Sequence, residues 1–123
     1  MLHQLDYTNK FQFTVKEGVT FKNATLVHPL MQIEVQSLID QLSEDLTVNK
    51  VIVFGSSVTL HCNSFSDLDV LVQRTDYNVK LNPYPICDVA LDLLFQNDLG
   101  ESILKEIQET GVLVFDREEY KNV

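Results

Sequence analysis

Two aspartates separated by one apolar residue form the part of the sequence best suited to chemistry. Asp67 and Asp69 flank Leu68, and a strand here would point both carboxylates to the same face, since side chains alternate along a strand. At a separation of about 4 Å and an effective dielectric constant of about 20, the two charges repel by roughly 4 kcal/mol. A fold keeps such a pair when a cation neutralises it or one acid takes a proton. Mg²⁺ or Mn²⁺, which prefer oxygen ligands, are the natural cations.

A third carboxylate is expected from a neighbouring strand. The segment 86–95 carries Asp88 and Asp92, four residues apart, and a strand would place both on one face. Asp92 lies among leucines, where a charge is costly unless it has a partner. Asp88 lies at the polar end of the segment, beside a proline-containing loop, where solvent can satisfy it.

A Gly-Ser pair after an apolar run suits an anion. Gly55 and Ser56 end the run 51–54 abruptly, and a buried strand that leads into Gly-Ser and a short helix exposes backbone N–H groups at the helix start. Gly55 permits close approach of the backbone. Ser56 can cap the helix or donate its hydroxyl to a phosphate oxygen, and Ser57 suits a helix cap or a phosphate ligand equally well.

Taken together, these motifs resemble those of the DNA polymerase beta-like nucleotidyltransferases. The shared order is an apolar strand, Gly55-Ser56, ten further residues, Asp67-Leu68-Asp69-Val70 and a third acid on a later strand. The most similar branch is the minimal nucleotidyltransferases, whose third acid lies six or seven residues before an acidic-Leu pair. Asp92 has this relation to Asp98-Leu99, and Asp88 does not. The resemblance covers roughly residues 30–116.

The resemblance implies an enzyme that moves a nucleoside monophosphate from a nucleoside triphosphate, expected to be ATP, to a hydroxyl acceptor and releases pyrophosphate. The implied cofactor is Mg²⁺, with Mn²⁺ as the alternative cation. The implied site residues are Asp67, Asp69 and Asp92 for the metal and catalysis, and Gly55, Ser56 and Ser57 for the nucleotide phosphates.

One departure from the family pattern favours a second function. Family members commonly carry arginines soon after Gly-Ser, whereas residues 57–63 contain no Arg or Lys. The charge of a triphosphate must then be met by metal or by distant bases, for which the candidates are Lys50, Arg74, Lys80 and Lys105. The alternative is an interaction protein with the same fold, such as the antitoxin half of a toxin–antitoxin pair, because the minimal branch is often paired with a small helical partner protein. The intact acids favour the enzyme.

The sequence pattern predicts an α/β (α+β) fold, with a mixed sheet and flanking helices that would position these residues. Apolar periodicity and turn residues predict a β-hairpin over 11–21, a helix over 30–46, strands over 50–54, 68–73 and 86–95, a loop over 74–85, a helix that starts at 97 or 98 and stops at Gly111, and a strand over 112–115. The whole chain, 1–123, is expected to be one nucleotidyltransferase domain, with 1–28 as a hairpin extension and 30–116 as the family core.

Composition excludes other classes. Eighteen acidic and nine basic residues give a net charge of −9, which argues against a protein that grips nucleic acid through its own positive charge. No apolar run approaches the length of about 20 residues that a membrane span needs, and the N-terminus lacks a secretory signal pattern. The two cysteines are then expected to be reduced thiols in a cytoplasmic protein. The aromatic residues of the N-terminal segment, Phe11, Phe13 and Phe21, are expected to pack on the core or to form a homo-oligomer contact.

Overall fold

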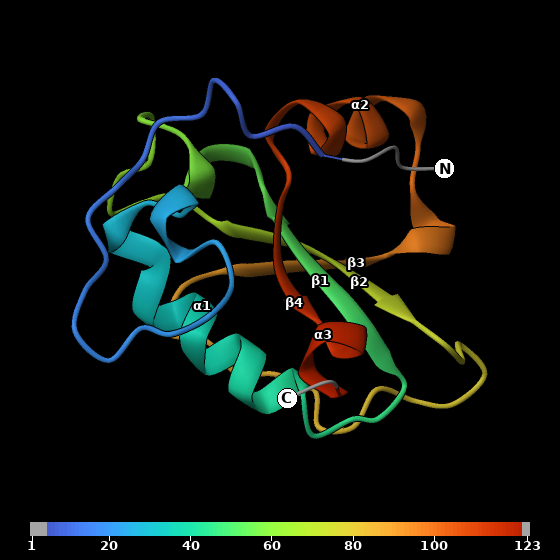
Figure 1. Ribbon diagram of the computed structural model, residues 1–123. Coiled ribbons are helices and arrows are strands. Elements are labelled where there is room, and N and C mark those ends of the chain that lie inside the picture. Colours follow the sequence, from blue (N-terminus) through green and yellow to red (C-terminus); the bar gives the residue numbers. More distant parts are fainter. Residues whose placement is uncertain (1–4, 122–123) are drawn as a thin grey trace.

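The computed structural model describes residues 5–121, which form a four-stranded mixed sheet flanked by helices (Figure 1). The main elements are α1 (Pro29–Leu42), β1 (Val48–Phe54), β2 (Leu68–Arg74), β3 (Leu91–Phe95), α2 (Glu101–Thr110), β4 (Val112–Asp116) and α3 (Arg117–Lys121). Short 3-10 turns are η1 (Ala24–Leu26), η2 (Gly55–Val58) and η3 (Gln96–Asp98). The expected mixed α and β class is confirmed. Within 5–121, no helix combines the length and apolar character that a membrane crossing requires.

The strand order brings the predicted site elements to one end of the sheet. The order is β3-β2-β1-β4, with β1 antiparallel to both of its neighbours and β2 parallel to β3. In this register Phe54 lies beside Asp69, and Asp69 lies beside Asp92. The end of β1, which leads into Gly55, therefore meets the beginnings of β2 and β3.

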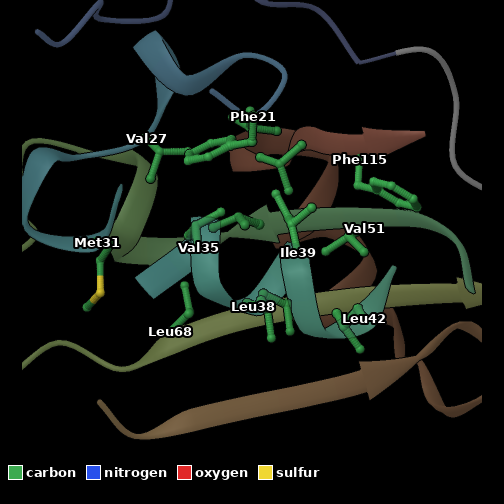
Figure 2. Packing of buried hydrophobic residues seen from close by; sticks show 14 of the residues in the cluster. Phe21, Val27, Met31, Val35, Leu38, Ile39, Leu42, Val51, Leu68 and Phe115 are labelled. Carbon is green, nitrogen blue, oxygen red and sulfur yellow. The ribbon is translucent and has the colours of Figure 1, made fainter. Parts of the chain in front are cut away.

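The two longer helices cover opposite faces of the sheet. On the α1 face, one large cluster joins helix and strand side chains, including Val35, Leu38, Leu42, Val51 and Leu68 (Figure 2). On the α2 face, Ile107 packs against Ile52, Phe54 and Leu71. Because β1 contributes to both clusters, its last four residues are all buried, which explains the uninterrupted apolar run in the sequence.

α1 is shorter than the predicted helix over 30–46, since it ends at Leu42. The carboxylate of Asp45 accepts hydrogen bonds from the Thr47 N–H at 2.8 Å and the Thr47 hydroxyl at 2.7 Å. A side chain that binds the backbone two residues ahead stabilises a turn in competition with the helix. Leu46 is consequently exposed to 78 % and does not extend the buried stripe.

The predicted β-hairpin over 11–21 is wrong. A turn is present at 17–18, but no strand ladder joins the segments on either side of it. Backbone N–H groups of this segment donate instead to two glutamines of α1. Gln32 Oε1 accepts the Lys16 N–H at 2.8 Å, and Gln36 Oε1 accepts the Thr20 N–H at 2.7 Å. The apolar alternation reflects packing on the core rather than a ladder, since the buried side chains are those of Phe13, Val19 and Phe21.

The strand predicted over 86–95 is also shorter, because β3 begins only at Leu91. The preceding residues run alongside α1 as a loop, and the Asp88 N–H donates to Glu34 Oε1 at 2.8 Å. This bond uses a backbone group that a longer strand would need for pairing. Asp88 therefore lies outside the sheet.

The described part of the N-terminal extension closes one edge of the sheet. At the outer edge of β4, the Leu113 N–H donates to the Tyr7 hydroxyl at 2.8 Å, and the Leu113 carbonyl accepts from Asn23 Nδ2 at 2.7 Å. Lys10 Nζ donates to the Glu109 carbonyl at the end of α2, at 2.9 Å. The segment (Figure 1) therefore prevents another strand from pairing with β4. It also holds the end of α2 in place through the Lys10 hydrogen bond.

Candidate functional site

The end of β1 requires a glycine for two separate reasons. Gly55 is buried and has φ of +78°, a left-handed conformation that other residues rarely adopt. A Cβ atom at this position would lie 2.7 Å from Asp69 Oδ2 and 3.2 Å from Glu106 Oε1. The missing side chain therefore lets two carboxylates approach the backbone at the end of β1.

Asp69 and Asp92 are lateral neighbours on one face of the sheet. The parallel register pairs Asp69 with Asp92 and Leu71 with Leu94. Leu71 and Leu94 belong to the cluster beneath α2, and alternation along each strand directs the two aspartates to the same side. Both carboxylates thus face the side of the sheet that α2 covers.

Asp92 is exposed, whereas the leucines around it in the sequence predicted a buried acid. Leu91 and Leu93 pack against the cluster on the α1 face, which is the opposite side of the strand. Within residues 5–121, β3 pairs with β2 alone and forms an edge of the sheet. Solvent therefore reaches Asp92, and its charge needs no buried partner.

Asp67 lies one residue before β2 and is exposed. Its carbonyl oxygen accepts a hydrogen bond from Ser57 Oγ at 3.2 Å, and Ser57 is completely buried. This bond ties η2 to the start of β2, so the Ser57 hydroxyl acts inside the protein and its expected phosphate contact gains no support. The half-buried Ser56 differs, because its hydroxyl makes no hydrogen bond within residues 5–121.

The electrostatic centre of the site is Asp69. Burial, followed by the negative charges of Asp92, Glu106 and Asp67, raises the pKa of Asp69 from its ordinary 3.8 to about 6. All of these causes disfavour the ionised carboxylate. At neutral pH Asp69 is therefore ionised in surroundings that oppose its charge, and a cation would relieve that opposition.

The ligand atoms of the site are of the type that a hard divalent cation prefers, but the side chains are not positioned to hold one. Carboxylate oxygens and excess negative charge suit Mg²⁺ or Mn²⁺. However, among the residues that the structure describes, no three His, Cys, Asp or Glu side chains are arranged to hold a metal ion. The predicted convergence of Asp67, Asp69 and Asp92 to metal-bridging distance is therefore not present. Like charges with access to solvent separate rather than converge, and Asp67 and Asp92 both have that access.

The Gly55 N–H is not exposed for an anion, although the Gly-Ser pattern predicted exposed N–H groups at this point. This N–H donates to Thr110 Oγ1 on α2 at 2.8 Å, and the Thr110 hydroxyl in turn donates to the Glu106 carbonyl at 2.8 Å. The turn η2 has four residues, which is too short for a helix dipole of useful size. Any anion contact in this turn therefore falls to Ser56 rather than to Gly55.

The distant bases do not replace the missing arginines. Arg74 is buried at the other end of β2, where Nε donates to Thr47 Oγ1 at 2.9 Å and Nη2 lies 3.8 Å from Asp45 Oδ2. Lys50 lies four residues before the end of β1. Lys105 is exposed and lies 3.9 Å from Glu109 on its own helix, and Lys80 is exposed in the loop before β3. Arg74 is thus a structural residue.

Glu106 is a site residue that the sequence patterns did not identify. It stands on α2 between Ile103 and Ile107, the residues that pack beneath the helix. Glu106 lies three residues after Ile103 and therefore on the same helix face. The apolar periodicity of the helix thus indicated that Glu106 is directed towards the sheet. Which end of the sheet the helix would cover depends on long-range packing, and the sequence pattern carries no such information.

No protein-family model matches this chain, and no curated protein matches it significantly.

Replacing Gly55 by alanine should destabilise the protein by about 2–3 kcal/mol, because backbone strain and a clash with Asp69 add. Gly18→Ala is the matched control, since Gly18 has φ of +86° but nothing within 4 Å of its added Cβ. Urea denaturation should give the larger loss for Gly55→Ala, and the excess should shrink when Asp69→Ala removes the carboxylate. Equal losses at the two glycines would contradict the close contact.

The stability that Asp69 contributes should fall as the pH rises, which is the reverse of the effect of an ion-paired carboxylate. Its pKa is higher in the folded protein than in the unfolded chain, so the stability it contributes is present below about pH 4 and is lost as the pH rises through about 6. Asp69→Asn should therefore gain stability relative to wild type between pH 4 and 7, by about 1–2 kcal/mol after allowance for solvent screening. Denaturation at a series of pH values measures this, with Asp88→Asn, at an exposed acid outside the sheet, as the control. A wild-type advantage that grows with pH would contradict the assignment.

Proposed function

We propose that this protein is a metal-dependent nucleotidyltransferase, which moves a nucleoside monophosphate from a nucleoside triphosphate, expected to be ATP, to a hydroxyl acceptor. The observation that carries the proposal is the placement of Asp69. Its carboxylate packs against Gly55, Asp92 lies beside it on the next strand, and Asp67 precedes it by two residues. The resemblance to the minimal nucleotidyltransferases supplies the reaction type.

In this proposal the acids hold the cation and the acceptor. Asp67, Asp69 and Asp92 would be the ligands if their side chains, which are not arranged to hold a metal ion in this structure, closed around the cation. Mg²⁺ or Mn²⁺ would then supply positive charge for the triphosphate and for the charge that develops during transfer. Asp92 is the carboxylate proposed to orient or deprotonate the attacking hydroxyl. A bond forms between the acceptor oxygen and the α-phosphorus, the bond from that phosphorus to the bridging oxygen breaks, and pyrophosphate leaves.

Ser56 is the proposed contact to the departing phosphates. Its hydroxyl is half-buried at the end of β1 and makes no hydrogen bond within residues 5–121, so it is available as a donor. Gly55 contributes by steric access rather than by its N–H, which Thr110 binds. With a net charge of −9, the protein repels a bare triphosphate, and nucleotide binding should therefore require the cation.

One observation favours the alternative of an antitoxin-type interaction protein. The loop between η2 and β2 exposes Leu60 to 66 % and Phe65 to 92 %. Hydrogen bonds from the Phe65 N–H to Asn63 Oδ1 at 2.8 Å and from the Asn63 N–H to Ser66 Oγ at 3.0 Å hold this loop. An ordered loop that presents two large apolar side chains suits contact with a partner protein, and a small helical partner could then supply the hydroxyl acceptor.

Millimolar Mg²⁺ or Mn²⁺ should raise the melting temperature of the wild-type protein, and more so with ATP. A ligand present at 100 times its Kd stabilises by about 2.7 kcal/mol, and each kcal/mol shifts the melting temperature of a domain of this size by roughly 3–7 °C. Asp69→Asn should lose the shift and reduce nucleotidyl transfer by orders of magnitude, since the ligand at the centre of the site is gone. Differential scanning fluorimetry and pyrophosphate release measure the two effects.

Asp88→Asn is the matched control, because Asp88 is exposed and lies outside the sheet; it should keep both the shift and the activity. Absence of any cation-dependent shift in wild type, with and without ATP, would reject the enzyme in favour of the interaction protein. A shift that survives Asp69→Asn would place the cation elsewhere.

A further inference from the structure

A single hydroxyl group joins α2 to the turn that follows β1. Thr110 Oγ1 accepts the Gly55 N–H at 2.8 Å and donates to the Glu106 carbonyl at 2.8 Å. A threonine hydroxyl has one proton to donate, so this proton is already used within α2. The oxygen is thereby oriented as an acceptor towards Gly55, across a sequence separation of 55 residues.

The hydrogen bond from the Gly55 N–H to Thr110 determines which polar group of the turn η2 is left to bind a ligand. It directs the Gly55 N–H towards α2, and the turn keeps the left-handed φ of +78° that brings Asp69 against Gly55. Ser57 turns inward to the Asp67 carbonyl. Ser56 is thus the residue of the turn whose hydroxyl is uncommitted within the described part of the chain.

We propose that Thr110 is a positioning residue: its hydroxyl fixes the Gly55 peptide and so sets Ser56 as the phosphate-binding residue of the turn. The inference rests on the proposed function for the identity of the ligand, an Mg²⁺-bound nucleoside triphosphate. It assigns Thr110 no contact with that ligand. A purely structural role would lower stability without changing nucleotide affinity, and the experiment separates the two roles.

Three variants isolate the hydroxyl group. Thr110→Val keeps the shape and removes the acceptor, and Thr110→Ser keeps the acceptor. Thr47→Val is the matched control, because Thr47 Oγ1 also accepts a hydrogen bond from a buried residue, Arg74, at 2.9 Å, but at the opposite end of β1. If Thr110→Val does not fold, Thr110→Ala replaces it, since its smaller side chain leaves room for water beside the Gly55 N–H.

Two readouts are measured: hydrogen exchange of the Gly55 amide by NMR, and the Kd for Mg²⁺-ATP by calorimetry. In Thr110→Val, Gly55 exchange should rise at least tenfold relative to the flanking amides, and the Kd should rise about fivefold to twentyfold. Thr110→Ser should restore both values, and Thr47→Val should lower the melting temperature and leave both unchanged. In a Ser56→Ala background, Thr110→Val should have no further effect on the Kd, because the contact that it positions is already absent.

Each outcome decides a separate claim. Unchanged Gly55 exchange in Thr110→Val overturns the inference whatever the nucleotide result. Faster exchange with an unchanged Kd also overturns it, since Thr110 is then structural. Failure of wild type to bind Mg²⁺-ATP rejects the proposed function and the phosphate part of the inference, while the Gly55 exchange still decides whether Thr110 holds the turn.

Discussion

The contact between the Asp69 carboxylate and the backbone of Gly55 is the constraint on which the rest of the site depends. A glycine with positive φ is needed because a Cβ atom there would lie 2.7 Å from Asp69 Oδ2. The contact holds Asp69 partly out of solvent, and neighbouring carboxylates act on it from β3 and α2. Burial and repulsion together oppose its charge, and the resulting demand for a counter-charge is the physical basis of the proposed cation site. The negative charge that the proposed chemistry needs at Asp69 therefore lowers the stability of the folded protein.

The elements around this contact hold it from both sides of the sheet. On one side, α2 ends at Thr110, and a Cβ atom at the next residue, Gly111, would lie 3.1 Å from a side-chain methyl of Ile52 on β1, so the end of α2 lies close against β1. Lys10 fastens the same helix end through the Glu109 carbonyl. On the other side, α1 and the N-terminal segment fill the larger core (Figure 2). The described part of the N-terminal segment, from residue 5 on, therefore supports the site through the core and through the end of α2.

Local patterns predicted that Asp69 and Asp92 share one face of the sheet, but they did not predict the surroundings of these acids. The shared face of Asp69 and Asp92 follows from strand alternation, which is a property of neighbouring residues. The exposure of Asp92 depends on β3 being an edge strand, and the strand order is decided by packing of the whole chain. The hairpin prediction failed because Gln32, from a helix sixteen residues away, binds the Lys16 N–H. The bond from Gly55 to Thr110 spans 55 residues, beyond the reach of any periodicity or motif.

Asp69 carries a carboxylate whose charge the fold opposes and a cation would favour. The most direct test is a pH titration of the Asp69 side-chain carboxyl carbon by NMR, without and with Mg²⁺. We expect a midpoint at about 6 in the absence of the cation and a fall of at least about one pH unit when Mg²⁺ is saturating. A midpoint near the ordinary value of 3.8, unchanged by Mg²⁺, would contradict this expectation.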